Sequence, residues 1–135
     1  MKTIEKNTDL GLLILRVLVA SLLILHGFGN LMSNYAFIKS MMVNSGLPEF
    51  LSYGAFVGEI VAPVLIIVGY KERLASMLVA FTMLMAIATT HSTEIFQLNQ
   101  FGGWAIELQA FYLFGALVIF FTGAGKYVAN YRLSS

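Results

Sequence analysis

Four apolar stretches dominate this sequence, over residues 10–31, 50–70, 74–91 and 104–122. Each is close to the roughly 20 residues that a helix needs to cross the hydrocarbon core of a bilayer. Hydrophobic residues make up 59% of the 135-residue chain and charged residues 11%, which leaves too little polar surface to cover a soluble globule. We therefore predict an integral membrane protein whose main partner is the lipid bilayer.

Short polar connections between the stretches predict an all-α, antiparallel bundle of four membrane-spanning helices. We expect one domain over residues 1–135, because no linker-like run divides the chain. Thr8 or Asp9 is expected to cap the first helix, and Pro63 to kink the second. We expect the first stretch to be a retained helix and not a removed signal peptide, since Arg16 interrupts its apolar run.

Lysine and arginine are distributed unevenly over the two sides of this bundle. The two connections over residues 33–49 and 92–103 carry only Lys39. The segments on the other side carry Lys2, Lys6, Lys71, Arg73, Lys126 and Arg132. Because positive residues concentrate in cytoplasmic loops, we predict that both termini are cytoplasmic, N-in and C-in.

Composition also excludes several classes of function. The net charge of +1, with no clustered basic face, argues against nucleic acid as a partner. The chain has no cysteine, which excludes a disulfide relay, a thiol nucleophile, an iron–sulfur cluster and a thiolate metal site.

A few polar residues inside the spans are the informative ones. They are Arg16, His26, Glu59, His91, Glu107 and Gln109. An ionisable group at the bilayer centre costs about 3 kcal/mol, so such groups usually face the bundle interior or approach an interface. Helical rise places the two histidines and two glutamates in the outer half of the bundle and Arg16 nearer the inner leaflet.

We therefore predict a polar pocket in the outer half of the bundle. Its candidate binding residues are His26, Glu59, His91, Glu107 and Arg16, and its candidate lining residues are Phe28, Trp104 and Gln109. Glu59 is expected at its floor and Trp104 near its mouth. The pocket is expected to open to the outer face through the connections over residues 33–49 and 92–103.

Each polar residue also has a purely structural interpretation. Arg16 either snorkels to the cytoplasmic headgroups or has an interior role. His91 is at a helix end, where a solvated histidine is common, and Glu107 is close enough to its helix N-terminus to serve it electrostatically. Glu59 lies near the middle of an uncharged helix, so we expect it to be protonated or paired with a cation.

Three kinds of ligand can be weighed against these residues: a quinone, a metal ion and a haem. Quinone binding needs a proton-exchanging histidine or carboxyl group near the carbonyls, and aromatic or methionine side chains around the ring. A metal site would have to use ligands such as His26, His91 and Glu107, but their spacing is nonlocal, and a haem would need a large cavity. We favour quinone over metal or haem, and the catalytic residues stay unassigned.

In these features the chain resembles the DoxX family of small four-span membrane proteins. The resemblance covers about residues 10–127 and rests on an ordered set of motifs: Arg16, His26-Gly27, Gly46-Leu47-Pro48, Gly58-Glu59, Gly69 with Arg73, Met85-Ala86 to His91, Gly103 with Glu107, and Gly123-x-Gly125-Lys126-Tyr127. The chain departs from the family pattern at Asn30, where a lysine is frequent, at Ala62-Pro63, where paired glycines are usual, and at Asn130, near a usual aspartate.

The resemblance implies a multi-pass protein of the bacterial inner (plasma) membrane. Relatives include a subunit associated with thiosulfate:quinone oxidation, proteins linked to amine-dehydrogenase maturation, and a membrane component of an oxidative-stress assembly. The expected function is a redox-associated membrane subunit, quinone-linked or part of an oxidative-stress assembly, that works with a membrane or periplasmic redox protein, or as a homo-oligomer. Whether it is an enzyme stays open. The alternatives are a non-catalytic scaffold or maturation factor, and a small transporter or proton path.

The predicted orientation can be tested with reporter fusions. A reporter fused after Ser135 should behave as cytoplasmic, and one inserted near Asn44 as periplasmic, because lysine and arginine concentrate on the side of the termini. Activity of an enzyme that folds only outside the cytoplasm, measured in whole cells, reads out both positions. The opposite pair of results would overturn the orientation.

Overall fold

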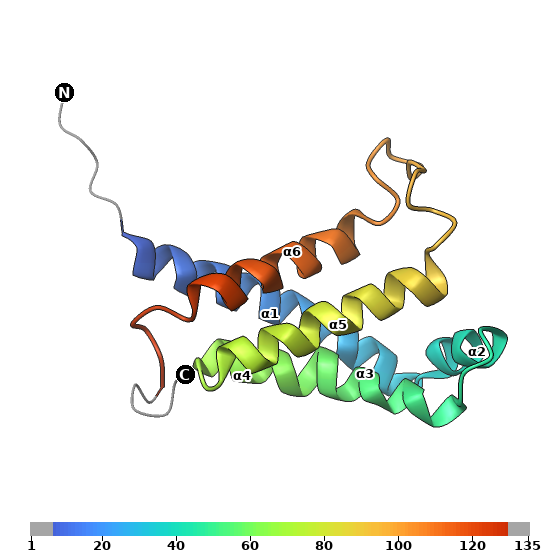
Figure 1. The fold of residues 1–135 in the computed structure, drawn as a ribbon, viewed down its shortest axis with the longest axis horizontal. Coiled ribbons are helices and arrows are strands. Elements are labelled where there is room, and N and C mark those ends of the chain that lie inside the picture. Colours follow the sequence, from blue (N-terminus) through green and yellow to red (C-terminus); the bar gives the residue numbers. More distant parts are fainter. Residues whose placement is uncertain (1–6, 130–135) are drawn as a thin grey trace.

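The structure is a computed structural model that describes residues 7–129, and it is built of helices (Figure 1). In chain order they are α1 (Thr8–Met32), α2 (Ala36–Asn44), η1 (Glu49–Tyr53), α3 (Gly54–Phe56), η2 (Val57–Val61), α4 (Ala62–Val68), α5 (Glu72–Thr90) and α6 (Glu107–Thr122). η1 is a 3₁₀-helix and η2 a π-helix, and η1, α3, η2 and α4 follow one another without a break as one rod. Within residues 7–129 the predicted all-α fold is confirmed.

Three helices are long and apolar enough to cross a membrane: α1, the rod Glu49–Val68, and α5. The fourth, α6, is apolar but has 16 residues, which span about 24 Å. It begins at Glu107 and not at Trp104, because Trp104 forms a β-bridge with Leu98 and its indole N–H donates to the Ile95 carbonyl at 2.5 Å. The residue that caps α1 is Asn7, not Thr8 or Asp9: its side chain accepts from the Leu10 N–H at 3.0 Å.

The four long elements pack as an antiparallel bundle. α1 and α5 each contact both α4 and α6. Figure 1 shows the start of α1, the end of α6 and the turn from α4 to α5 at one end of the bundle, with α2 and the loop between α5 and α6 at the other. This arrangement agrees with the predicted order of the helices, while the side that faces the cytoplasm stays a prediction.

Small residues bring the rod close to its neighbours. A Cβ added to Gly27 would lie 2.7 Å from the Glu59 Cβ and 2.8 Å from the Glu59 carbonyl oxygen, and one added to Gly58 would lie 2.7 Å from the Thr82 Cβ. Only glycine fits at distances this short, so α1 and α5 both approach the rod at the π-helical segment. The buried core continues from there with Val19, Leu23, Ala62, Ile66, Val79, Met83, Tyr112, Ala116 and Ile119.

Pro63 explains why the rod departs from α-helical geometry. A proline cannot donate a hydrogen bond to the carbonyl four residues earlier, and its ring crowds that carbonyl, which here belongs to Glu59. The wider π-helical turn over Val57–Val61 relieves the crowding. The effect of Pro63 is therefore to set the backbone geometry at Glu59.

Candidate functional site

A cavity of about 410 Å³ lies between α2, the first half of the rod, and α5. α2 contributes Ile38, Met41 and Met42; the rod contributes Leu51, Ser52, Gly54, Ala55, Val57, Gly58 and Glu59; α5 contributes Leu78, Phe81, Thr82, Met85, Ala86, Thr89 and Thr90. Most of these residues are apolar, and Glu59 is the one ionisable residue among them. The cavity volume is within the range of about 300–1,000 Å³ that is typical of small-molecule sites.

Glu59 is held in place by contacts with α1. Only 4% of the residue is exposed, and the Asn30 side-chain amide donates to its Oε2 at 2.8 Å. His26 lies one turn before Asn30 on α1 and is near enough to Glu59 to interact electrostatically. A hydrogen bond to Oε1 is absent among residues 7–129, so one carboxyl oxygen is left for another partner.

His26 and Phe28 belong to the outer surface of α1. Both side chains are exposed, Phe28 by 54%, and neither lines the cavity. Neither residue has a hydrogen bond to Glu59 among the described residues.

His91 and Gln109 form a second polar group, which joins the end of α5 to the first turn of α6. The His91 Nδ1 is 2.7 Å from the Glu94 Oε2, and its Nε2 is 3.2 Å from the Gln109 Nε2. With Glu94 ionised, Nδ1 donates and Nε2 accepts from the amide. This carboxylate–imidazole pair is partly exposed, and it follows Thr90, which lines the cavity. The pair is therefore accessible to solvent at that end of the bundle.

Glu107 and Trp104 belong to a hairpin and not to the cavity. Glu107 is exposed at the first residue of α6, and its Oε1 accepts from the Asn99 amide at 3.3 Å. The Asn99 Oδ1 in turn accepts from the main-chain N–H groups of Phe101 and Gly103, which folds the loop on itself. The described residues show no hydrogen bond or ion pair among His26, His91 and Glu107, so the structure divides the predicted pocket into separate groups.

Arg16 lies near the opposite end of α1, about 20 Å from Asn30 by helical rise. It is completely buried, which excludes the snorkelling alternative. Its Nε donates to the Ile66 carbonyl at 3.0 Å, its Nη2 to Ile67 at 2.7 Å, and its Nη1 to Ala124 at 3.0 Å and Tyr127 at 2.7 Å. Arg16 therefore joins the end of α4 to the segment that follows α6.

A metal site needs several histidine, cysteine, aspartate or glutamate side chains close together. Across residues 7–129, no group of three or more histidine, cysteine, aspartate or glutamate residues could hold a metal ion. His26, His91 and Glu107 accordingly do not form a ligand set. The chemistry that the described site supports is proton exchange and hydrogen bonding by Glu59 in an apolar cavity.

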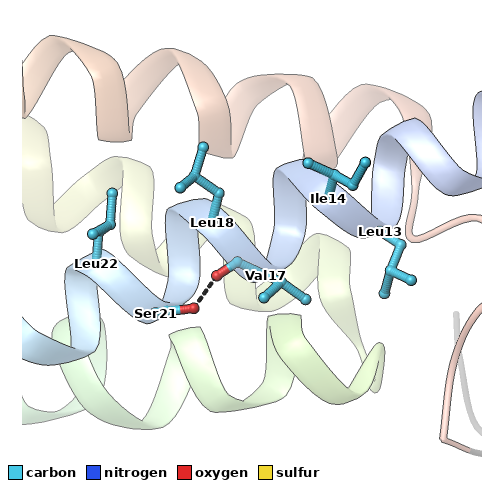
Figure 2. Close-up of a pocket in the computed structure, with 6 residues that line it drawn as sticks. All are labelled: Leu13, Ile14, Val17, Leu18, Ser21 and Leu22. Atoms are coloured by element: carbon cyan, nitrogen blue, oxygen red, sulfur yellow. Dashed lines mark hydrogen bonds between the residues drawn. The ribbon is translucent and has the colours of Figure 1, made fainter.

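A second hollow, of about 440 Å³, runs along α1 (Figure 2). It is lined by Leu13, Ile14, Val17, Leu18, Ser21 and Leu22. The Ser21 hydroxyl already donates to the Val17 carbonyl of the same helix. With no charged side chain and its hydroxyl satisfied, this groove suits a lipid acyl chain and offers no polar contact to a ligand.

Comparison with known proteins identifies the family. The DoxX family model matches residues 11–92. The chain belongs to the DoxX family. A Bacillus subtilis (strain 168) protein named "Putative oxidoreductase CatD" is 29% identical to it over 85 residues, and the match spans 63% of each of the two chains. No solved structure matches the chain. Membership of the DoxX family and the long apolar helices together show that this is a multi-pass membrane protein.

One motif of the resemblance and one departure from it acquire a physical role in the structure. The Gly123-x-Gly125-Lys126-Tyr127 segment has positive φ at both glycines, 76° and 78°, and this path presents the carbonyls of Ala124 and Tyr127 to Arg16. Asn30, which departs from the family pattern, is the residue that holds Glu59. The departure at Asn130 is outside the described residues.

Sequence reasoning missed Tyr35, which is buried near Glu59. Only 3% of Tyr35 is exposed, and its hydroxyl has no hydrogen-bond partner among the described residues. Burial raises the pKa of this hydroxyl above its ordinary value, and the charge of Glu59 raises it further. Tyr35 thus stays a neutral donor at physiological pH. It lies in the predicted outer connection, and the sequence carries no signal that this connection folds back onto the bundle.

We expect Arg16→Lys to destabilise the protein. A lysine ammonium keeps the charge but lacks the planar fork that reaches two segments at once, so we estimate a loss of about 3 kcal/mol in the free energy of unfolding. Thermal unfolding in detergent, followed by circular dichroism, measures it. The control is Arg73→Lys at the same end of the bundle, where the side chain is exposed. Equal unfolding midpoints for the two variants would contradict the role of Arg16.

Proposed function

We propose that this DoxX family member is a redox-associated membrane subunit that binds a quinone in the Glu59 cavity. The observation that carries the proposal is a single buried carboxyl group on the wall of a mostly apolar cavity. A carboxyl group in such surroundings can donate a hydrogen bond to a quinone carbonyl when protonated, or accept one from a quinol hydroxyl when ionised.

The rest of the cavity suits a flat apolar ring. Met41, Met42 and Met85 supply flexible, polarisable thioethers, which pack well against aromatic and quinoid rings. Phe28, Trp104 and Gln109, proposed from the sequence as lining residues, do not line this cavity. The methionines take that role instead.

Electrons must come from another molecule in this proposal. Reduction of a quinone to a quinol takes up two electrons and two protons, and the chain has no cysteine to form a disulfide or an iron–sulfur centre. A membrane or periplasmic electron-transfer protein would supply or accept the two electrons, while Glu59 exchanges one of the two protons and water exchanges the other. The name of the Bacillus subtilis relative, an oxidoreductase, is consistent with this association.

The proposal also includes the membrane in which the protein resides and its oligomeric state. The protein would reside in the bacterial inner membrane with both termini in the cytoplasm, alone or as a homo-oligomer. In that orientation the His91–Glu94 pair faces the periplasm and meets the redox partner from that side.

A scaffold or maturation factor is the second candidate, because several polar residues join helices. Arg16 connects α1 to the end of α4, Asn30 and Glu59 connect α1 to the rod, and His91 and Gln109 connect α5 to α6. Interhelical hydrogen bonds of this kind contribute about 1 kcal/mol each in membranes. On this alternative the Glu59 contact would only stabilise the bundle.

Glu59→Gln separates the two candidates. A glutamine oxygen can still accept from Asn30, so we expect the variant to fold with an unchanged unfolding midpoint, whereas Glu59→Lys should not fold. The lost carboxyl should weaken binding of decylubiquinone at least about tenfold, measured by equilibrium binding to detergent-purified protein.

The control is Glu107→Gln, which changes an exposed carboxyl outside the cavity and should leave affinity unchanged. Absence of quinone binding by the native protein, or equal affinity of native and Glu59→Gln protein, would contradict the proposed function. An unchanged affinity combined with a lowered unfolding midpoint would favour the scaffold.

A further inference from the structure

We infer that the ligand of the Glu59 cavity enters sideways from the bilayer, between the rod and α5, and that it is an amphiphile with an apolar tail. This inference rests on the proposed function, because it concerns the same cavity. It adds the route of entry and the class of molecule that the cavity selects.

The exposure of the lining residues shows where the cavity opens. Its deep wall is formed by Ser52, Ala55 and Glu59, which are 0%, 9% and 4% exposed. Its rim includes Val57 on the rod and Phe81 on α5, which are 42% and 63% exposed. Both belong to elements apolar enough to cross a membrane. The opening therefore faces lipid.

α2 covers the cavity toward the end of the bundle. Asn34 and Tyr35 both adopt left-handed backbone conformations, with φ of 54° and 58°, and this reversal folds α2 back onto η1 and α5. The Tyr35 ring then meets the Tyr53 ring edge-on, with centroids 5.8 Å apart. Residues 92–103 contribute nothing to the lining. The route through the outer connections, expected from the sequence, is thus occupied by α2.

The hydrogen bonds of the lining hydroxyls restrict what the cavity can hold. Ser52 donates to Glu49, Thr82 to Leu78, and Thr89 to Met85, each to a main-chain carbonyl at 2.7 Å. The Thr90 hydroxyl lies 3.4 Å from the Thr89 hydroxyl. The protons of the Ser52, Thr82 and Thr89 hydroxyls are therefore engaged within their own helices, and the one ionisable contact in the cavity comes from Glu59. A ligand with one polar ring at depth and an apolar tail across the rim matches this distribution.

Gly54 provides a way to close the opening without disturbing the bundle. It lines the cavity and is exposed, and a Cβ added to it would meet no atom within 4 Å. Its φ of −60° is helical, so a larger residue can adopt the same backbone. A phenylalanine there would project into the side opening.

The test uses egg phosphatidylcholine vesicles containing the full-length protein and two probes, decylubiquinone and the same quinone ring without a tail. Binding is measured at equal concentrations of probe in the membrane. We expect the tail-free ring to bind at least about tenfold more weakly, and Gly54→Phe to weaken binding of decylubiquinone by a similar factor. Gly11→Phe is the matched control, because Gly11 is also exposed, has no atom within 4 Å of an added Cβ, and lies outside the cavity.

A second variant tests the same opening if Gly54→Phe does not fold. Phe81→Ala widens the same opening and should raise the association rate of decylubiquinone severalfold. If both rings bind equally and neither substitution changes affinity or rate, the inference is overturned, while Glu59-dependent binding would leave the proposed function intact. If neither probe binds, the proposed function fails and the inference fails with it.

Discussion

The buried guanidinium of Arg16 is the constraint on which the end of the bundle near the α4–α5 turn depends. The last carbonyls of any helix have no partner within the helix, and in a membrane no water replaces it. Arg16 satisfies two such carbonyls, of Ile66 and Ile67 near the end of α4, and two more, of Ala124 and Tyr127, beyond α6. A positive charge also suits the negative end of the α4 dipole. One side chain thus ties three segments together.

The other half of the bundle is organised around Glu59, and its geometry follows from two neighbours in different helices. Pro63 leaves the Glu59 carbonyl without its usual donor and favours the π-helical turn. Gly27 allows α1 to approach that turn at a distance that excludes any larger side chain. The carboxyl group then reaches Asn30. A π-helical turn, a close helix–helix contact and a buried acid coincide on the wall of the Glu59 cavity.

Hydropathy predicted the helical bundle and most helix ends, because the length of an apolar run and the thickness of a bilayer are both visible in a sequence. The start of α6 was missed, since Trp104 looks like an interfacial helix residue and instead pairs with Leu98 in a hairpin. Depth alone placed His26, Glu59, His91 and Glu107 together, but depth does not give the direction in which each residue points around its helix. The fold of α2 over the cavity depends on the left-handed pair Asn34 and Tyr35, for which the sequence has no glycine signal.

Chemical labelling of Glu59 tests the central claim, that this carboxyl group faces an apolar cavity open to the bilayer. Lipid-soluble dicyclohexylcarbodiimide reacts with protonated carboxyl groups in apolar surroundings, whereas a water-soluble, cationic carbodiimide reaches only exposed ones. Mass spectrometry of peptides from the labelled membrane protein locates the product. We expect the lipid-soluble reagent to label Glu59, the water-soluble reagent to label exposed Glu107 and not Glu59, and decylubiquinone to protect Glu59. Labelling of Glu59 by the water-soluble reagent, or by neither, would contradict the account.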